Sequence, residues 1–223
     1  MIVMRTSGTS EPDGHGPQRA SGPVIHVVDD EPMAVKAMKR LLLSAGRSVR
    51  TYESAEAFLR AAAANLDGCL LLDVQMPGLD GLALQEKLQE AGCLLPVIFL
   101  TGHGDIPSSV RAMKAGAVDY LCKPVQEAVL FAAIERALQK SAREKERGRS
   151  EEESRRRAQT LTPRERQVFS LVVSGLMNKE IAALLGTAEK TVKVHRGRVM
   201  GKMAARSLAQ LVRMAAAMER PAT

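Results

Sequence analysis

The stretch CLLLDVQMPGLDG, residues 69–81, carries one carboxylate out of an apolar strand and into a turn that contains proline and glycine. Leu70, Leu71 and Leu72 form a continuous apolar run, which is typical of a strand covered on both faces in a parallel sheet. Asp73 follows this run directly. Because open α/β sheets bind their ligands outside the carboxyl ends of their strands, Asp73 is a candidate functional residue. A lone aspartate in this position is more often a turn former or a helix cap. Whether Asp73 is functional therefore depends on the residues that follow the other strands.

Strand and helix patterns alternate five times between residues 23 and 138, which predicts an α/β fold with a doubly wound parallel sheet. The expected sheet has five strands. Glycines just past the periodic segments mark the expected helix ends. The expected strands are Val24–Val28, 49–52, 70–73, 97–100 and 119–122.

Charge is distributed unevenly along the 223 residues. Residues 159–223 hold 11 Lys and Arg against 4 Asp and Glu, whereas residues 24–138 hold 11 against 14. Such asymmetry favours a nucleic acid as the partner of the C-terminal part. Apolar runs all fall well short of the roughly 20 residues that a membrane span needs, and the N-terminal residues do not have the apolar core of a signal peptide. We therefore expect a cytoplasmic protein with no membrane partner.

Composition divides the chain into four parts. A leader rich in Gly, Ser, Pro and Thr is expected to be disordered, and a run of mixed charges with almost no apolar residue is expected to be a helical linker. The segment after it begins with Thr162, Pro163 and Glu165, a pattern that predicts the start of a helix with a capping box. The expected parts are a disordered leader (1–22), an α/β domain (23–138), a charged linker (139–158) and an all-α domain (159–223).

Polar residues follow four of the five expected strands. Asp29 and Asp30 follow the first strand, and Asp73 follows the third. Thr101 and Lys123 follow the fourth and fifth strands. In a parallel sheet these ends converge, which brings carboxylates, a hydroxyl and an ammonium group around one small space. Carboxylates suit Mg²⁺, and one of them can be the nucleophile in a phosphoryl transfer, which depends mostly on positioning and charge neutralisation.

The motifs VVDDE (27–31), DVQMPGLDG (73–81), LTGHGD (100–105) and DYLCKP (119–124) resemble those of a two-component response-regulator receiver domain. The resemblance implies that a sensor histidine kinase phosphorylates Asp73 and that a homodimer then forms through the surface over residues 106–138. It also implies a flavodoxin-like fold, in which the bond before Pro124 is commonly cis. The implied Mg²⁺ ligands are Asp29, Asp30, Asp73 and the Gln75 backbone carbonyl, and the implied phosphoryl-binding and switch residues are Thr101, Tyr120 and Lys123.

A hydrolase with an aspartyl nucleophile, such as a haloacid-dehalogenase-type phosphatase, is the alternative for this domain. Those enzymes carry a second Asp two residues after the nucleophile as the general acid. This chain has Gln75 there, and an amide cannot exchange a proton in that way. We therefore expect a regulator rather than an enzyme, with no catalytic residue.

The segment LTPRERQVFSLVVSGLMNKEIAALLGTAEKTVKVHRGRVMGKM resembles a LuxR-type helix-turn-helix, in particular that of FixJ-like regulators. Its third helix, from Glu189 to about Met203, has one apolar face and one face with two lysines and a small valine, which suits entry into a major groove. Two departures stand out. Ala188 replaces the usual Ser or Thr cap, and Gly197 replaces a lysine used by nitrate-regulator relatives. The expected DNA-contacting residues are Lys190, Thr191, Lys193, Val194, Arg196 and Gly197.

Together these patterns predict a transcriptional regulator that is phosphorylated on Asp73 and then binds double-stranded promoter DNA. The same interpretation allows a contact with RNA polymerase. An RNA-binding antiterminator is the alternative output, against which the capped four-helix pattern and the two-faced third helix argue.

Overall fold

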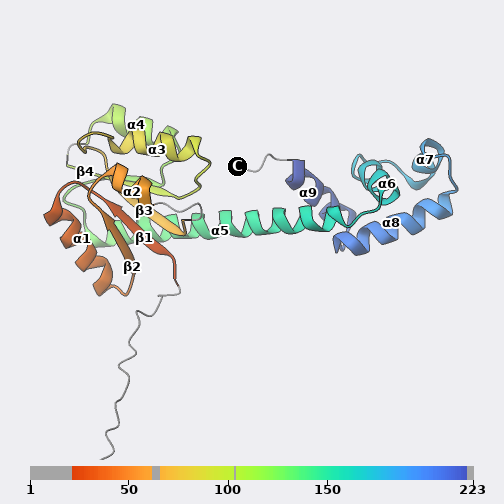
Figure 1. Cartoon of the computed structure of the whole chain (residues 1–223), viewed down its shortest axis with the longest axis horizontal. Coiled ribbons are helices and arrows are strands. Elements are labelled where there is room, and N and C mark those ends of the chain that lie inside the picture. The colour runs from red at the N-terminus through yellow and green to blue at the C-terminus, as the bar shows by residue number, and fades with distance from the viewer. Residues whose placement is uncertain (1–21, 62–65, 103, 220–223) are drawn as a thin grey trace, which may run out of the picture.

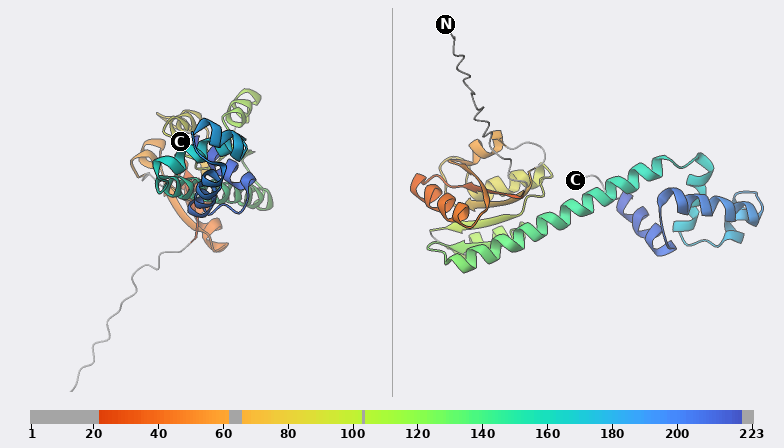
Figure 2. Two further views of the ribbon diagram at one scale, coloured as in Figure 1. Left: turned by 90° about the vertical axis from the view of Figure 1, so that its right-hand side faces the viewer. Right: turned by 90° about the horizontal axis from the view of Figure 1, so that it is seen from below.

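Two folded bodies are joined by one long helix in the computed structural model, which describes residues 22–61, 66–102 and 104–219 (Figures 1 and 2). The leader predicted for residues 1–22 lies, except for Gly22, outside these residues. The first body contains β1 (Val24–Val28), α1 (Pro32–Ser44), β2 (Ser48–Tyr52), α2 (Ala55–Ala61), β3 (Gly68–Asp73), α3 (Gly81–Glu90), β4 (Val97–Thr101), α4 (Ile106–Lys114) and β5 (Asp119–Cys122). Then follow α5 (Glu127–Gln159), α6 (Pro163–Val173), α7 (Asn178–Leu184), α8 (Glu189–Met203) and α9 (Leu208–Glu219).

The five strands form one parallel sheet in the order β2-β1-β3-β4-β5, which confirms the predicted fold. The register pairs Val28 with Leu72, Asp73 with Leu100, and Thr101 with Cys122. The carboxyl ends of these strands therefore lie side by side at the same edge of the sheet.

The apolar run before Asp73 serves two cores. Leu70 and Leu72 pack with residues of α2, α3 and α4 on one face of the sheet, whereas Leu71 packs with residues of α1 and α5 on the other. All three side chains are fully buried, and burial of one such side chain contributes about 2 kcal/mol. This two-sided burial explains why the run is continuous rather than alternating.

The turn after Asp73 brings Gly81, the first residue of α3, against the backbone of Asp73. A Cβ atom at Gly81 would lie 2.1 Å from the Asp73 carbonyl oxygen, so only glycine fits there without a shift of the backbone. The Asp80 carboxylate accepts a hydrogen bond from the Ala83 amide and so caps α3. The Gly81 amide donates to the carbonyl of Val74. The sequence DG at the end of the motif is therefore a packing requirement of the loop that carries Asp73.

Helix α5 is shared by both bodies. Its first part buries Leu130, Ile134 and Ala137 against the sheet. The helix continues through Gly148 to Gln159, and ion pairs between residues four apart support its solvated part. Within the described residues, no helix is long and apolar enough to cross a membrane.

The C-terminal body is a cluster of short helices around its own core. Val168, Ile181, Val192, Val199, Met203 and Leu211 are fully buried there. The capping box predicted at the start of α6 is confirmed, since the Thr162 amide donates to the Glu165 carboxylate and the Glu165 amide donates to the Thr162 hydroxyl. The pKa of Glu165 is lowered to about 2. The hydrogen bond from the Lys202 ammonium is the largest cause, and the bond from the Thr162 backbone amide is the next.

His26 on β1 is a buried ionisable group in the first body. Its ring contacts that of Tyr52, at a centroid distance of 5.9 Å, and that of Phe58, at 5.8 Å, and these two rings also contact each other. Nδ1 is 3.1 Å from the Tyr52 hydroxyl. Burial, and next the charge of Arg50, lower the pKa of His26 to about 4. The ring is thus neutral in the folded protein at pH values at which it is protonated in the unfolded chain.

We expect His26→Phe to reduce the pH dependence of the first body's stability. With a folded pKa of about 4 against 6.5 in the unfolded chain, His26 stabilises the fold above pH 6.5, and this contribution is lost as the pH falls toward 4. Between pH 7 and pH 5 it changes the free energy of unfolding by about 2 kcal/mol. Urea unfolding of both proteins at the two pH values measures the difference, and equal pH dependence would contradict it.

Candidate functional site

Three carboxylates meet at the carboxyl edge of the sheet. Asp29 and Asp30 follow β1, and Asp73 ends β3. Asp29 and Asp73 are 4% and 8% exposed, whereas Asp30 is exposed. One oxygen from each lies within 4.8 Å of the others, a spacing at which all three can reach one cation. The convergence predicted from the strand ends is therefore present.

Lys123 brings the positive charge to this group. Its ammonium lies 2.6 Å from Asp29 Oδ2 and 3.7 Å from Asp73 Oδ1. The Lys123 amide donates to the Thr101 carbonyl at 2.7 Å, which continues the pairing of β5 with β4 past Cys122. The bond between Lys123 and Pro124 is cis, as the resemblance implied. The side chain thus reaches across from the edge strand to the ends of β1 and β3.

Backbone amides fix the two buried carboxylates. The Glu31 amide donates to Asp29 Oδ1, and the Val74 amide donates to Asp73 Oδ1, each at 2.9 Å. Both carboxylates are therefore oriented by the first residues of the loops that follow their strands.

The electrostatics of the site show a shortage of positive charge. Burial is the largest influence on Asp73 and raises its pKa; Lys123 opposes this, and the nearby Asp29 and Asp30 add to it. For Lys123, burial acts to lower the pKa, but the contact with Asp29 and the charge of Asp73 outweigh it, so the pKa is raised. Lys123 thus pairs with two of the three carboxylates. A divalent cation with a preference for oxygen ligands, such as Mg²⁺, fits this donor set.

Thr101 and Tyr120 lie on the neighbouring strands. Thr101 ends β4 and is fully buried, and Tyr120 on β5 is half-buried with its ring centroid 6.0 Å from that of Phe99. Burial raises the pKa of Tyr120, while the Thr101 hydroxyl lowers it. The two residues therefore lie on adjacent paired strands, Thr101 at the end of β4 and Tyr120 within β5.

Glu56 on α2 also shapes the site, although the sequence patterns did not indicate it. Its carboxylate accepts a hydrogen bond from the Leu79 amide at 3.1 Å and so anchors the loop between Asp73 and α3. The pKa of Glu56 is lowered by hydrogen bonds to its carboxylate. In order of size these come from its own backbone amide, the Ser54 side chain and the Leu79 amide. Gln75 lies exposed in the same loop. A glutamate on an amphipathic helix carries no local signal for such a contact with a distant loop.

Helix α8 presents a polar face to solvent. The structure places five of the six predicted DNA-contacting residues on its exposed side. Arg196 is half-buried and donates to Asn178 Oδ1 on α7 at 3.1 Å, whereas Arg198, which was not among the predicted residues, is exposed. Ala188 is the N-cap and provides no side-chain hydrogen bond, as its apolar side chain predicted. The five exposed residues are Lys190, Thr191, Lys193, Val194 and Gly197.

Two protein-family models match this chain. "Response regulator receiver domain" matches residues 25–135. "Bacterial regulatory proteins, luxR family" matches residues 159–215. The first match covers the acidic site and the second covers α8.

Similar proteins span both bodies. Nodulation protein W of Bradyrhizobium diazoefficiens is 44% identical over 191 residues, 86% of this chain and 84% of that protein. Transcriptional regulatory protein FixJ of Rhizobium meliloti is 45% identical over 193 residues, 86% of this chain and 95% of that protein. The solved structure of the response regulator StyR has a TM-score of 0.74 and 45% identity, and the match covers 87% of this chain and 98% of that chain.

Proposed function

This chain belongs to the response regulators that join a receiver domain to a LuxR-type DNA-binding domain, and on that premise we propose that its phosphoryl acceptor is Asp73. The protein is the transcriptional regulator of a two-component system, with a histidine kinase and DNA as its partners. The observation that carries the proposal is the close approach of three carboxylates and the Lys123 ammonium at one edge of the sheet.

Phosphoryl transfer to Asp73 needs a nucleophile that is held in place and a site that neutralises the incoming charge. The Asp73 carboxylate is oriented by the Val74 amide, and an oxygen of this carboxylate attacks the phosphorus of a phosphohistidine while the P–N bond breaks. Lys123 lies close enough to bind the transferred phosphoryl oxygens. Asp29, Asp30, Asp73 and the Gln75 carbonyl would hold Mg²⁺. When bound, this ion offsets the negative charge of the carboxylates and of the phosphoryl group.

Thr101 and Tyr120 are the proposed switch. In this proposal the Thr101 hydroxyl moves toward a phosphoryl oxygen on Asp73, and the ring of Tyr120 turns further inward. Because Tyr120 lies on the strand between α4 and α5, its movement changes the surface that these helices form. That surface already exposes apolar side chains, of which Ile106 is 78% exposed and Val110 and Met113 on α4 are nearly half exposed.

The proposed active form is a homodimer on promoter DNA in the cytoplasm. Pairing through the α4, β5 and α5 surface joins two DNA-binding domains, so each raises the effective concentration of the other at adjacent half-sites. The exposed residues of α8 then enter the major groove, with lysines near phosphates or guanine edges and Val194 near thymine methyl groups. A promoter-bound dimer of this kind can also meet RNA polymerase.

We expect the protein to take up one phosphoryl group from acetyl phosphate only when Mg²⁺ is present. Asp73→Asn removes the nucleophile and should abolish the mass increase, whereas Asp67→Asn, which changes a carboxylate paired with Lys145 outside the site, should not. Lys123→Ala should still take up some phosphoryl group, but the labelled variant should change its structure much less than the labelled wild-type protein. Intact-mass analysis measures the uptake, and undiminished labelling of Asp73→Asn would refute the assignment.

Lys193→Ala tests the proposed recognition face. If Lys193 contacts a base, the variant loses about 1 to 3 kcal/mol of specific binding and discriminates less at one position. If it contacts only phosphate, affinity falls for all duplexes alike and the salt slope decreases by about one unit. Arg213→Ala, the control, removes one positive charge from α9. It should change neither the specific affinity nor the salt slope. Salt titrations on specific and random duplexes decide, and unchanged binding by Lys193→Ala contradicts both roles.

Phosphorylation should convert a mainly monomeric protein with weak DNA binding into a dimer. Val110→Glu places a charge in the apolar surface on α4 and should leave the phosphorylated protein monomeric. Leu43→Glu changes an equally exposed leucine on α1 and should not. Light scattering before and after treatment with acetyl phosphate measures the mass. An unchanged mass of the phosphorylated wild-type protein would exclude dimerisation in solution.

A further inference from the structure

The last turns of α5 are part of the C-terminal body. Ser154 is 4% exposed, and its hydroxyl donates to the Ser150 carbonyl one turn earlier. Ala158 packs against the apolar core formed by α6, α7, α8 and α9. A segment that the sequence shows as a solvated run of charges therefore has one face in contact with the DNA-binding helices.

Two helix C-termini come together in this contact. Helix α5 ends at Gln159 with Thr160 as its cap, and α8 ends at Met203 with Ala204, in the left-handed region at φ 50°, as its cap. The last carbonyls of any helix have no partner within the helix, and each C-terminus carries roughly half a negative charge. Two such ends side by side repel one another unless donors or cations lie between them.

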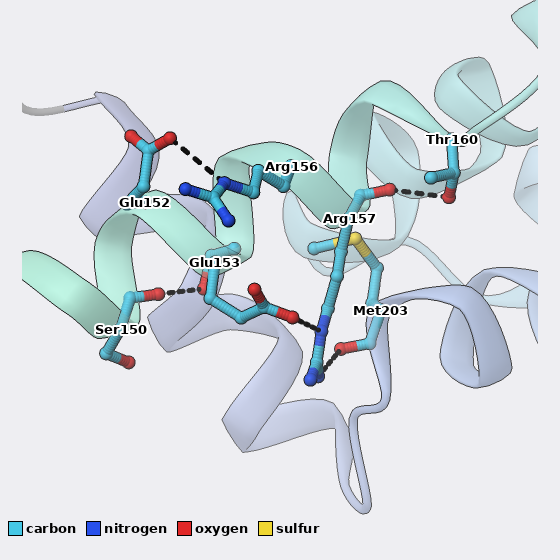
Figure 3. Close-up of polar contacts among 8 residues, drawn as sticks. Ser150, Glu152, Glu153, Arg156, Arg157, Thr160 and Met203 are labelled. Carbon is cyan, nitrogen blue, oxygen red and sulfur yellow. Dashed lines mark hydrogen bonds and ion pairs between the residues drawn. The ribbon is translucent and has the colours of Figure 1, made fainter.

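Basic side chains satisfy these two ends reciprocally. The Arg157 guanidinium on α5 donates through Nη1 to the Met203 carbonyl at 3.1 Å. The Lys202 ammonium on α8 donates to the Thr160 carbonyl at 3.0 Å and to the Glu165 carboxylate at 2.6 Å. Figure 3 shows the Arg157 side chain crossing from α5 to Met203. Each helix thus supplies the cation that caps the other.

Arg157 is itself held in the position from which it reaches α8. Its Nε donates to Glu153 on the preceding turn at 2.8 Å, and its side chain is 35% exposed. Arg156, the next residue back along the helix, makes the same kind of pair with Glu152 at 3.2 Å, but its side chain is 69% exposed (Figure 3). The two arginines therefore share charge, helix and ion pairing, and differ in the hydrogen bond to Met203.

We propose that Arg157 is a positioning residue for the recognition helix: it ties the C-terminal end of α8 to the helix that comes from the receiver domain. The residues of α8 that face DNA lie toward the other end of that helix, so loosening its C-terminal end changes the angle at which they meet the groove. The proposal rests on the DNA-reading role proposed above for α8. It assigns no DNA contact to Arg157.

The test compares three variants of the full-length phosphorylated protein: Arg157→Ala, Arg156→Ala and Arg157→Lys. The probes are a duplex that the wild-type protein enriches from a random-sequence pool, and a scrambled duplex of the same composition. Arg157→Ala should lose up to about tenfold in affinity for the enriched duplex, a limit set by the one charge-assisted hydrogen bond that no longer positions α8, and little for the scrambled one. Arg156→Ala should match the wild type, and Arg157→Lys, which retains an ammonium donor, should recover most of the loss.

The salt slope and the stability separate this role from two others. A phosphate contact by Arg157 would weaken both duplexes alike and lower the salt slope by about one unit. A purely structural role would lower the thermal unfolding temperature and weaken both duplexes in proportion to the unfolded fraction. Either result, or equal behaviour of Arg157→Ala and Arg156→Ala, would overturn the proposal. Enrichment of no sequence by the wild-type protein would instead refute the proposed DNA-reading function and this inference with it.

Discussion

Three carboxylates and one ammonium group share a small space because parallel strands all end at the same edge of a sheet. Burial of Asp29 and Asp73 at that edge makes their negative charge expensive, and the contact of Lys123 with both relieves only part of it. Because the effect of burial exceeds that of Lys123, the pKa of Asp73 is raised. A site in this state gains most from groups that bring positive charge or that change the charge on Asp73, which are the events that a phosphorylation switch requires.

The same edge strand connects this chemistry to the DNA-binding body. Lys123 follows β5, the cis bond to Pro124 comes next, and α5 begins at Glu127. Tyr120 lies on the same short strand and touches the cluster that α4 closes. Lys123 and Tyr120 are therefore close in sequence to the start of a helix whose last turns contact the end of the recognition helix.

Much of this could be predicted because the deciding features are local in sequence. The continuous apolar run before Asp73 indicates two-sided burial, and the polar residues after four strands indicate a site, since topology alone brings strand ends together. The capping box at Thr162 and the missing cap at Ala188 are likewise properties of adjacent residues. Contacts between distant segments are different. Glu56 with Leu79, and Arg157 with Met203, join side chains of common type to backbone groups far along the chain, and periodicity contains no information about them.

Helix α5 has a further consequence that follows from its length. Its 33 residues span about 50 Å at 1.5 Å per residue, and its turns are held by hydrogen bonds and ion pairs along the way. A rod of this length works as a lever arm. About 21 residues, or about 32 Å, follow Leu138, the last residue of α5 that packs on the sheet core, so a tilt of about 5° there moves the far end by about 3 Å. In the proposed switch, a small tilt of α5 at the sheet would reach the recognition helix enlarged by the length of this rod, without a relay of side chains.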